Sequence, residues 1–217
     1  MTSDSRIPRN NSALPASNAQ TGADAKAILR KELLAARRAI PPETRAQWDA
    51  DICRHVVEWW RQSRVQALGV YWPLRDEPDL SAAYAELARL GARLLLPVVV
   101  QRDAALEFAD WEIGEAMVKD AMGIAVPAQL RMDAPPAALL VPCLGYNRGG
   151  FRLGYGGGFY DRTLAKAPRP ATVGIAYSCL AADFGSDAHD IALDRIITET
   201  TVDPAKAGRS ADAAQER

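Results

Sequence analysis

The 217-residue sequence has little histidine and cysteine, which limits the metal and redox chemistry it can perform. Its two histidines, His55 and His189, exclude a histidine-rich metal site. The three cysteines are widely spaced, form no CxxC motif and are odd in number, so they fit neither a zinc site nor a disulfide framework. We therefore expect the protein to work in a reducing, cytoplasmic compartment.

Long apolar runs and a strong charge of one sign are also missing. No apolar run approaches the ~18 residues that a membrane-spanning helix needs. The first 23 residues are rich in Ser, Asn, Ala and Pro and lack the apolar segment of a secretory signal. With 26 basic and 27 acidic side chains, the net charge of −1 gives no sign of a nucleic-acid or membrane partner. We expect a monomer that acts on small molecules, since no long exposed apolar stretch is evident.

Glycine is concentrated in one segment. Residues 145–162 read GYNRGGFRLGYGGGFYDR and contain seven of the fifteen glycines. The segment follows an apolar run at 137–142 and leads into a predicted helix, so its backbone N–H groups can bind phosphate. No GK[ST] follows, as a Walker A motif requires, and the dinucleotide-binding pattern does not fit. Spacing alone leaves both a phosphate site and a plain loop open, and it favours the phosphate site.

Charged residues near this segment and near the N-terminus are candidate ligands. Arg148 and Arg152 can pair with phosphate oxygens, and the Asp161 carboxylate can bind magnesium. Lys26 and Arg30 lie one turn apart on a predicted helix, with Arg37 on the same stripe. The first two could bind a triphosphate, but their spacing alone favours a solvated basic face.

The order of elements predicts an α/β fold with three layers and a mostly parallel central sheet. We expect one domain over residues 24–202, between disordered tails at 1–23 and 203–217. Helices are predicted at 24–40, 42–62, 81–90 and 161–166, and strands at 65–71, 92–100, 106–111, 139–141, 172–176 and 196–198. Residues 112–136 are predicted to be irregular.

Two segments are expected to face one crevice, because ligands bind beyond the carboxyl ends of the strands in such sheets. Residues 72–77 follow the first predicted strand, and residues 149–161 follow the strand at 139–141. Trp72 and Glu77 combine a flat aromatic ring with a carboxylate, which suits a heterocycle such as a pterin. Trp111 is a further candidate for this pocket, although a core tryptophan is the stronger alternative.

Four sequence blocks in the same order carry a family resemblance. They are 26–38 (KAILRKELLAARR), 70–80 (VYWPLRDEPDL), 141–162 (VPCLGYNRGGFRLGYGGGFYDR) and 189–199 (HDIALDRIITE). Together they resemble the 5-formyltetrahydrofolate cyclo-ligase family over roughly residues 25–200, and imply its Rossmann-like fold. The chain departs from the family pattern at Asn147, where members often carry Asp, and at Val126, where many carry Glu.

The resemblance implies an enzyme that uses ATP and Mg²⁺ to cyclise 5-formyltetrahydrofolate, with or without a polyglutamate tail, to 5,10-methenyltetrahydrofolate. It places ATP at Lys26, Arg30, Arg152, Leu153, Gly154, Tyr155, Gly156, Gly157, Gly158, Phe159 and Tyr160. It places folate at Trp72, Glu77, Tyr155, Gly156, Gly157, Gly158 and Phe159. Asp161 and Asp190 match magnesium ligands, although Asp190 also fits a helix or turn cap.

Of these residues, Lys26, Arg152 and Asp161 are the expected catalytic residues. Two other functions remain open at this point. One is a nucleotide-dependent phosphotransferase of the same fold that acts on a substrate other than folate. The other is a protein that stores reduced folate or nucleotide without turnover, against which the retained candidate carboxylates and cations argue.

Overall fold

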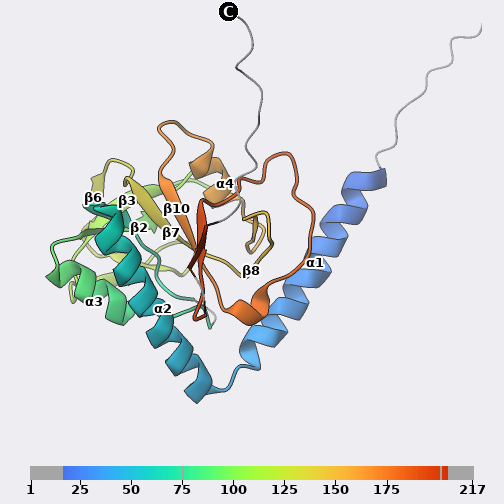
Figure 1. Ribbon diagram of the computed structural model, residues 1–217. Coiled ribbons are helices and arrows are strands. Elements are labelled where there is room, and N and C mark those ends of the chain that lie inside the picture. The colour runs from blue at the N-terminus through green and yellow to red at the C-terminus, as the bar shows by residue number, and fades with distance from the viewer. Residues whose placement is uncertain (1–16, 75, 201, 205–217) are drawn as a thin grey trace, which may run out of the picture.

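The computed structural model describes residues 17–74, 76–200 and 202–204. Its centre is an eight-stranded sheet in the order β12-β11-β10-β7-β1-β2-β3-β6 (Figure 1). These strands are β1 (Ala67–Gly69), β2 (Arg93–Val98), β3 (Glu107–Trp111), β6 (Arg131–Asp133), β7 (Ala138–Pro142), β10 (Ala171–Ile175), β11 (Arg195–Ile197) and β12 (Val202–Pro204). The five strands from β11 to β2 are parallel, and β12, β3 and β6 add antiparallel pairs at the two edges.

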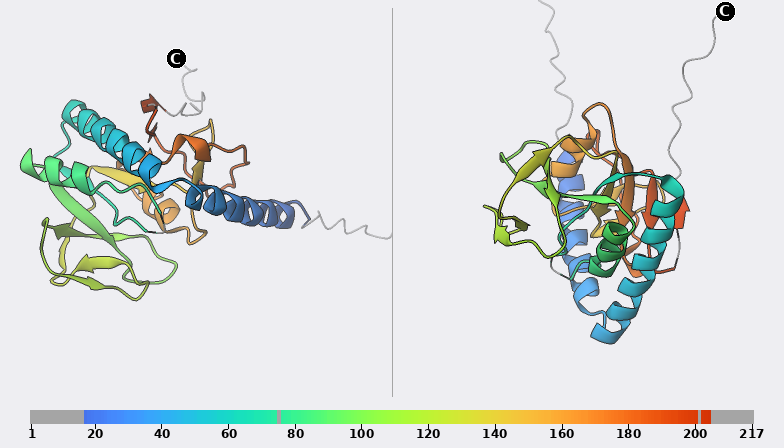
Figure 2. Two further views of the ribbon diagram at one scale, coloured as in Figure 1. Left: turned by 90° about the horizontal axis from the view of Figure 1, so that it is seen from below. Right: turned by 90° about the vertical axis from the view of Figure 1, so that its left-hand side faces the viewer.

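The described residues also form a short 3-10 helix at Ser178–Leu180 and four α-helices. The α-helices are α1 (Ser17–Arg38), α2 (Pro42–Ser63), α3 (Ser81–Arg89) and α4 (Phe159–Leu164). Pro42 starts α2, where its missing N–H costs no hydrogen bond, and the apolar stripe of α2 is buried through Ile52 and Val56. Helices α1 and α2 meet in a V, and α1 projects from the body of the molecule (Figures 1 and 2). No helix in the described part of the chain is long and apolar enough to cross a membrane.

Apolar side chains on both faces of the sheet build two cores. Along β2, Leu94 and Leu96 pack in the core that includes residues of α2 and α3, whereas Leu95 belongs to the core on the other face. Leu140 and Leu139 divide in the same way on β7. A strand buried on both faces reads as a continuous apolar run, so the runs at 92–100 and 139–141 were sound evidence for central strands. The predicted three-layer α/β fold is confirmed.

The structure corrects several predicted boundaries. Helix α1 begins at Ser17, so the segment predicted as a tail at 1–23 ends in seven helical residues. Their Ser, Asn and Gly have weak helix propensity, and this composition indicated a tail. Strand β12 likewise reaches Pro204, beyond the predicted domain end at 202. The predicted tail residues 1–16 and 205–217 lie outside the described residues.

Short strands were the elements that the sequence pattern missed. The stretch 112–136 is not irregular, because it contains β4 (Met117–Lys119), β5 (Ala125–Pro127) and β6. The glycine-rich segment contains a second hairpin, β8 (Gly145–Tyr146) with β9 (Arg152–Leu153). Strands of two or three residues are too short to show an alternating pattern, and all three residues of β6 are exposed.

Candidate functional site

A cavity of about 950 Å³ lies at the carboxyl ends of the parallel strands. Its walls come from α1, the loop after β1, the glycine-rich loop before α4 and the segment 187–191. Trp72, Leu74 and Glu77 therefore meet residues 152–161 at one crevice, as the strand order predicted for these parts of the two segments. The lining includes the predicted site residues Lys26, Arg30, Trp72, Glu77, Arg152, Leu153, Gly154, Tyr155, Gly156, Gly157, Gly158, Phe159, Tyr160, Asp161 and Asp190.

Two glycines of the glycine-rich loop have positive φ angles, a backbone conformation that strains any residue with a side chain. Gly156 and Gly158 have φ angles of 92° and 64°. A Cβ atom at Gly158 would lie 2.7 Å from Nη1 of Arg162, so a larger residue there would also displace the Arg162 guanidinium. The Arg162 guanidinium donates to the carbonyl oxygen of Gly157 at 2.6 Å and fastens the loop to α4. The result is a tightly turned backbone against the cavity, the kind of surface that suits phosphate oxygens.

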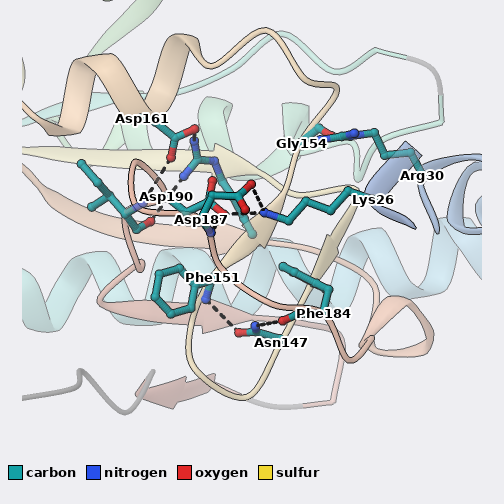
Figure 3. Close-up of polar contacts among 11 residues, drawn as sticks. Lys26, Arg30, Asn147, Phe151, Gly154, Asp161, Phe184, Asp187 and Asp190 are labelled. Atoms are coloured by element: carbon teal, nitrogen blue, oxygen red, sulfur yellow. Dashed lines mark hydrogen bonds and ion pairs between the residues drawn. The ribbon is translucent and has the colours of Figure 1, made fainter. Parts of the chain in front are cut away.

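Arg152 and Asp161 face each other at this loop. Nη2 of Arg152 lies 2.9 Å from Oδ2 of Asp161, and the Arg152 side chain is 6% exposed. The other carboxylate oxygen, Oδ1, accepts the N–H of Ile191 at 3.3 Å (Figure 3). The guanidinium also lies 5.6 Å from the centre of the Tyr160 ring. One predicted phosphate ligand is thus held against one predicted magnesium ligand. Arg148, by contrast, is exposed and lies outside the cavity lining.

Lys26 forms a second charged cluster beside the Arg152–Asp161 pair (Figure 3). Its Nζ donates to Oδ2 of Asp187 and to Oδ2 of Asp190, both at 2.7 Å (Figure 3). Burial alone would lower the pKa of Lys26, but the two carboxylates outweigh it and raise the pKa. Burial acts against the charge of Asp190 too, and its bonds to Lys26 and to the Asp187 N–H lower its pKa overall. Both groups therefore stay charged at neutral pH. Asp190 also closes a turn, as its alternative role suggested.

Helix α1 is joined to the glycine-rich loop at two points. Nε of Arg30 donates to the carbonyl oxygen of Gly154 at 2.9 Å. Seven residues further along α1, Arg37 is completely buried, and its Nη2 donates to the Tyr155 hydroxyl at 2.5 Å. Sequence reasoning placed Arg37 on the stripe of Lys26 and Arg30 but gave it no role. That shared stripe was the one signal by which it could have been found.

The cavity lining also contains the carboxylate and the aromatic ring predicted for a heterocycle. Glu77 is 6% exposed, and its Oε2 accepts the N–H of Leu74 at 2.8 Å while its Oε1 accepts the Tyr155 hydroxyl at 2.9 Å. Burial raises the pKa of Tyr155 to about 12, the negative charge of Glu77 adds to this, and Arg37 opposes it. The Tyr155 hydroxyl therefore stays protonated and can donate a hydrogen bond to Glu77.

Trp72 lines the cavity, but Trp111 lies outside the lining. The Trp111 ring packs edge-on against Trp72, with ring centres 5.9 Å apart, and against Tyr84 at 5.8 Å. Trp111 therefore packs against Trp72 without lining the cavity itself. This placement favours the core role for Trp111 over the predicted direct contact with a ligand.

A family model described as the 5-formyltetrahydrofolate cyclo-ligase family matches residues 23–199. The chain belongs to this family. A protein named 5-formyltetrahydrofolate cyclo-ligase from Mycolicibacterium smegmatis is 33% identical over 186 residues, which cover 80% of this chain and 93% of that protein. The protein of the same name from Mycoplasma pneumoniae is 28% identical over 177 residues.

Solved structures agree with the cyclo-ligase assignment. The NMR structure of Aquifex aeolicus 5,10-methenyltetrahydrofolate synthetase is similar with a TM-score of 0.74 and 27% identity, covering 87% of this chain and 96% of that one. A 5,10-methenyltetrahydrofolate synthetase from Mycoplasma pneumoniae gives a TM-score of 0.68 at 27% identity. It covers 80% of this chain and 98% of the other.

The two departures from the cyclo-ligase pattern have structural explanations in this chain. Oδ1 of Asn147 accepts the N–H groups of Gly149 and Phe151, and its Nδ2 donates to the carbonyl oxygen of Phe184 at 2.9 Å (Figure 3). An ionised Asp could accept the first two bonds but could not donate the third. Val126 is buried on β5 in an apolar cluster with Val98, where a valine needs no partner but the charge of a glutamate would need one.

Proposed function

We propose that this chain is an ATP-dependent 5-formyltetrahydrofolate cyclo-ligase, which forms 5,10-methenyltetrahydrofolate, ADP and phosphate. One observation carries the proposal within the family: a single cavity is lined both by a phosphate-type glycine loop and by the Trp72–Glu77 pair. Its volume of about 950 Å³ is at the upper end of the range of about 300–1,000 Å³ for small-molecule sites. Two sizeable substrates that react with each other need such a shared space.

The phosphate end would take ATP. We assign Lys26, Arg30 and Arg152, with the backbone of residues 154–158, to the triphosphate. These cations come from α1 and from the glycine-rich loop, and Lys26 and Arg152 are each held in place by carboxylates. Charged groups that are already oriented stabilise developing negative charge without reorganising during the reaction.

The donor set near this loop also fits magnesium. Mg²⁺ is commonly bound by one or two carboxylates while substrate phosphates and waters complete its shell. Asp161 and Asp190 both line the cavity, and among the described residues no cluster of three or more His, Cys, Asp or Glu could hold a metal by itself. We assign these two carboxylates to magnesium brought with ATP. When bound, the ion would neutralise charge on the phosphates.

The heterocycle end would take the pterin of the folate. Glu77 would accept hydrogen bonds from ring N–H groups, because it lines the cavity and an ionised carboxylate acts only as an acceptor. The Trp72 indole offers a flat apolar surface in the same lining. The glycine-rich loop, through Tyr155 and Phe159, would contact both substrates.

The chemistry follows from holding the two substrates together. The formyl oxygen attacks the γ-phosphorus of ATP and ADP leaves. N10 then attacks the activated carbon, and phosphate departs as the new ring closes. Phosphorylation is needed because the formyl oxygen is otherwise a poor leaving group. The protein supplies orientation and charge neutralisation, and no protein nucleophile takes part.

The test is the formation of the methenyl chromophore. Purified protein is mixed with 5-formyltetrahydrofolate, ATP and magnesium, and absorbance is followed at the methenyl band while ADP is measured by a coupled assay. We expect a rise that requires all three components, with one ADP formed per methenyl product. Three reactions, each lacking one component, serve as controls. A folded protein that binds ATP yet gives no rise would overturn the proposal and favour a phosphotransferase acting on another substrate.

A further inference from the structure

Arg37 is the largest of the fully buried side chains, and its surroundings need an explanation. An arginine is almost never fully buried unless it is paired, because removing its charge from water is costly. Its Nη2 reaches the Tyr155 hydroxyl at 2.5 Å, and its guanidinium carbon lies 5.8 Å from the centre of the Tyr155 ring. The buried end of α1 therefore reaches the glycine-rich loop at Tyr155, 118 positions away in sequence.

Tyr155 also connects Arg37 to Glu77, the carboxylate predicted for the heterocycle. Its hydroxyl accepts from Arg37 and donates to Oε1 of Glu77 at 2.9 Å. The ring is 42% exposed, yet the hydroxyl lies between two buried charged groups. Because the tyrosine keeps its proton at neutral pH, it can donate to the carboxylate while it accepts from the guanidinium.

The three residues come from three segments that are far apart in the sequence. Arg37 lies on α1, Tyr155 on the glycine-rich loop, and Glu77 in the loop after β1. Tyr155 is flanked by Gly154 and by Gly156, whose φ is positive. A loop so rich in glycine loses much conformational freedom when it binds a ligand, unless other contacts already hold it. The hydroxyl of Tyr155 provides such a contact at the centre of the loop.

We infer that Arg37 is a positioning residue that, through the Tyr155 hydroxyl, fastens the phosphate loop to the carboxylate of the pterin pocket. The free enzyme then holds both subsites in their binding arrangement, so neither substrate has to order the loop. This inference rests on the proposed function for the identity of the two substrates. Under this inference Arg37 contacts neither substrate, and Arg37 acts only through Tyr155.

The test compares two tyrosine hydroxyls that both contact a carboxylate. Tyr155→Phe removes the hydroxyl at Glu77. Tyr177→Phe is the matched control, because the Tyr177 hydroxyl donates to Asp49 at 2.7 Å and Tyr177 lies outside the cavity lining. Dissociation constants are measured by calorimetry for a non-hydrolysable ATP analogue with magnesium and for 5-formyltetrahydrofolate, each alone and then in the presence of the other.

We expect Tyr155→Phe to weaken each ligand alone by about tenfold, as the loss of a charge-assisted hydrogen bond in a preorganised site predicts. The ligand bound first then orders the loop, so the second ligand is weakened less, and positive coupling between them exceeds that of the wild type. Tyr177→Phe should leave both constants within about twofold. If Tyr155→Phe changes folate binding alone, or neither constant, the inference is wrong.

Arg37 supplies the second arm. Arg37→Met removes the donor to Tyr155, and Arg37→Lys keeps a charge without the guanidinium geometry. Arg38→Met is the control on the same helix, because Arg38 is exposed. We expect Arg37→Met to reproduce the coupling change of Tyr155→Phe, with partial rescue in Arg37→Lys. Should Arg37→Met fail to fold, Tyr155→Phe still decides. If the wild type forms no methenyl product, the proposed function fails, and the nucleotide measurements still test the link from α1 to the loop.

Discussion

Arg152 and Asp161 are ion-paired across 2.9 Å, although the sequence predicted separate partners for them in phosphate and magnesium. Arg152 is almost completely buried, whereas Asp161 is 23% exposed toward the cavity. A buried guanidinium needs a counter-charge, and a carboxylate has lone pairs for more than one partner. The pair therefore agrees with both roles: Asp161 keeps Arg152 in place and leaves oxygen surface for a metal that arrives with ATP.

Replacement of Asp161 tests this arrangement. Asp161→Ala should nearly abolish turnover, by about a hundredfold or more, since it removes a magnesium ligand and the partner of Arg152. Asp161→Asn keeps the shape and should raise the magnesium concentration needed for half-maximal turnover. Asp183→Ala, at an exposed carboxylate outside the cavity lining, is the control. Circular dichroism checks that each variant is folded. Turnover of Asp161→Ala within about tenfold of the wild type would remove the magnesium role.

Lys26 is the second charge to test, because two aspartates hold it at the cavity wall. Lys26→Met should lower kcat/KM for ATP by about 10- to 100-fold, as expected when a charged contact to phosphate is lost. KM for the folate should change much less. The exposed Lys31, on the same helix, gives the control variant Lys31→Met. A KM for the folate that changes as much as the KM for ATP would contradict a specific contact between Lys26 and ATP.

The sequence predicted those parts of the fold and site that local patterns encode. Apolar runs located the central strands, and residues 152–161 of the glycine-rich segment line the cavity as predicted, whereas Arg148 does not. The two-residue strands β8 and β9 were missed because their pairing depends on a turn around Asn147 and not on periodicity. Local pattern therefore locates the loop but does not give its shape.

Partners distant in sequence were beyond prediction for a different reason. The stripe of Lys26, Arg30 and Arg37 was visible, but a stripe gives no partner. Folding brings Asp187 to Lys26 and Tyr155 to Arg37 over more than a hundred residues. Whether a cation on a helix is solvated or buried is decided by these tertiary contacts. The spacing favoured the solvated alternative because that is the more common outcome for surface helices.

Cys143 gives a prediction about stability at alkaline pH. Burial raises the pKa of its thiol to about 12, with Arg152 opposing, against an ordinary value of 9.0. The folded state thus holds the proton more tightly than the unfolded chain, which releases it first as pH rises. Stability linked to this group is complete below about pH 9 and falls between about pH 9 and 12. The buried thiol of Cys53, whose pKa is raised to about 11, acts in the same direction.

The free energy of unfolding should be measured in urea at about pH 8 and about pH 10, for the wild type and for Cys143→Ala. The wild type should lose stability between these values, and the Cys143 thiol should account for about 1.4 kcal/mol of the loss. Cys143→Ala should begin less stable, because it leaves a small cavity, but should lose correspondingly less as pH rises. The comparison between the two pH values removes the cavity term, which is the same at both. Identical losses in the two proteins would show that the Cys143 thiol is not held protonated by the fold.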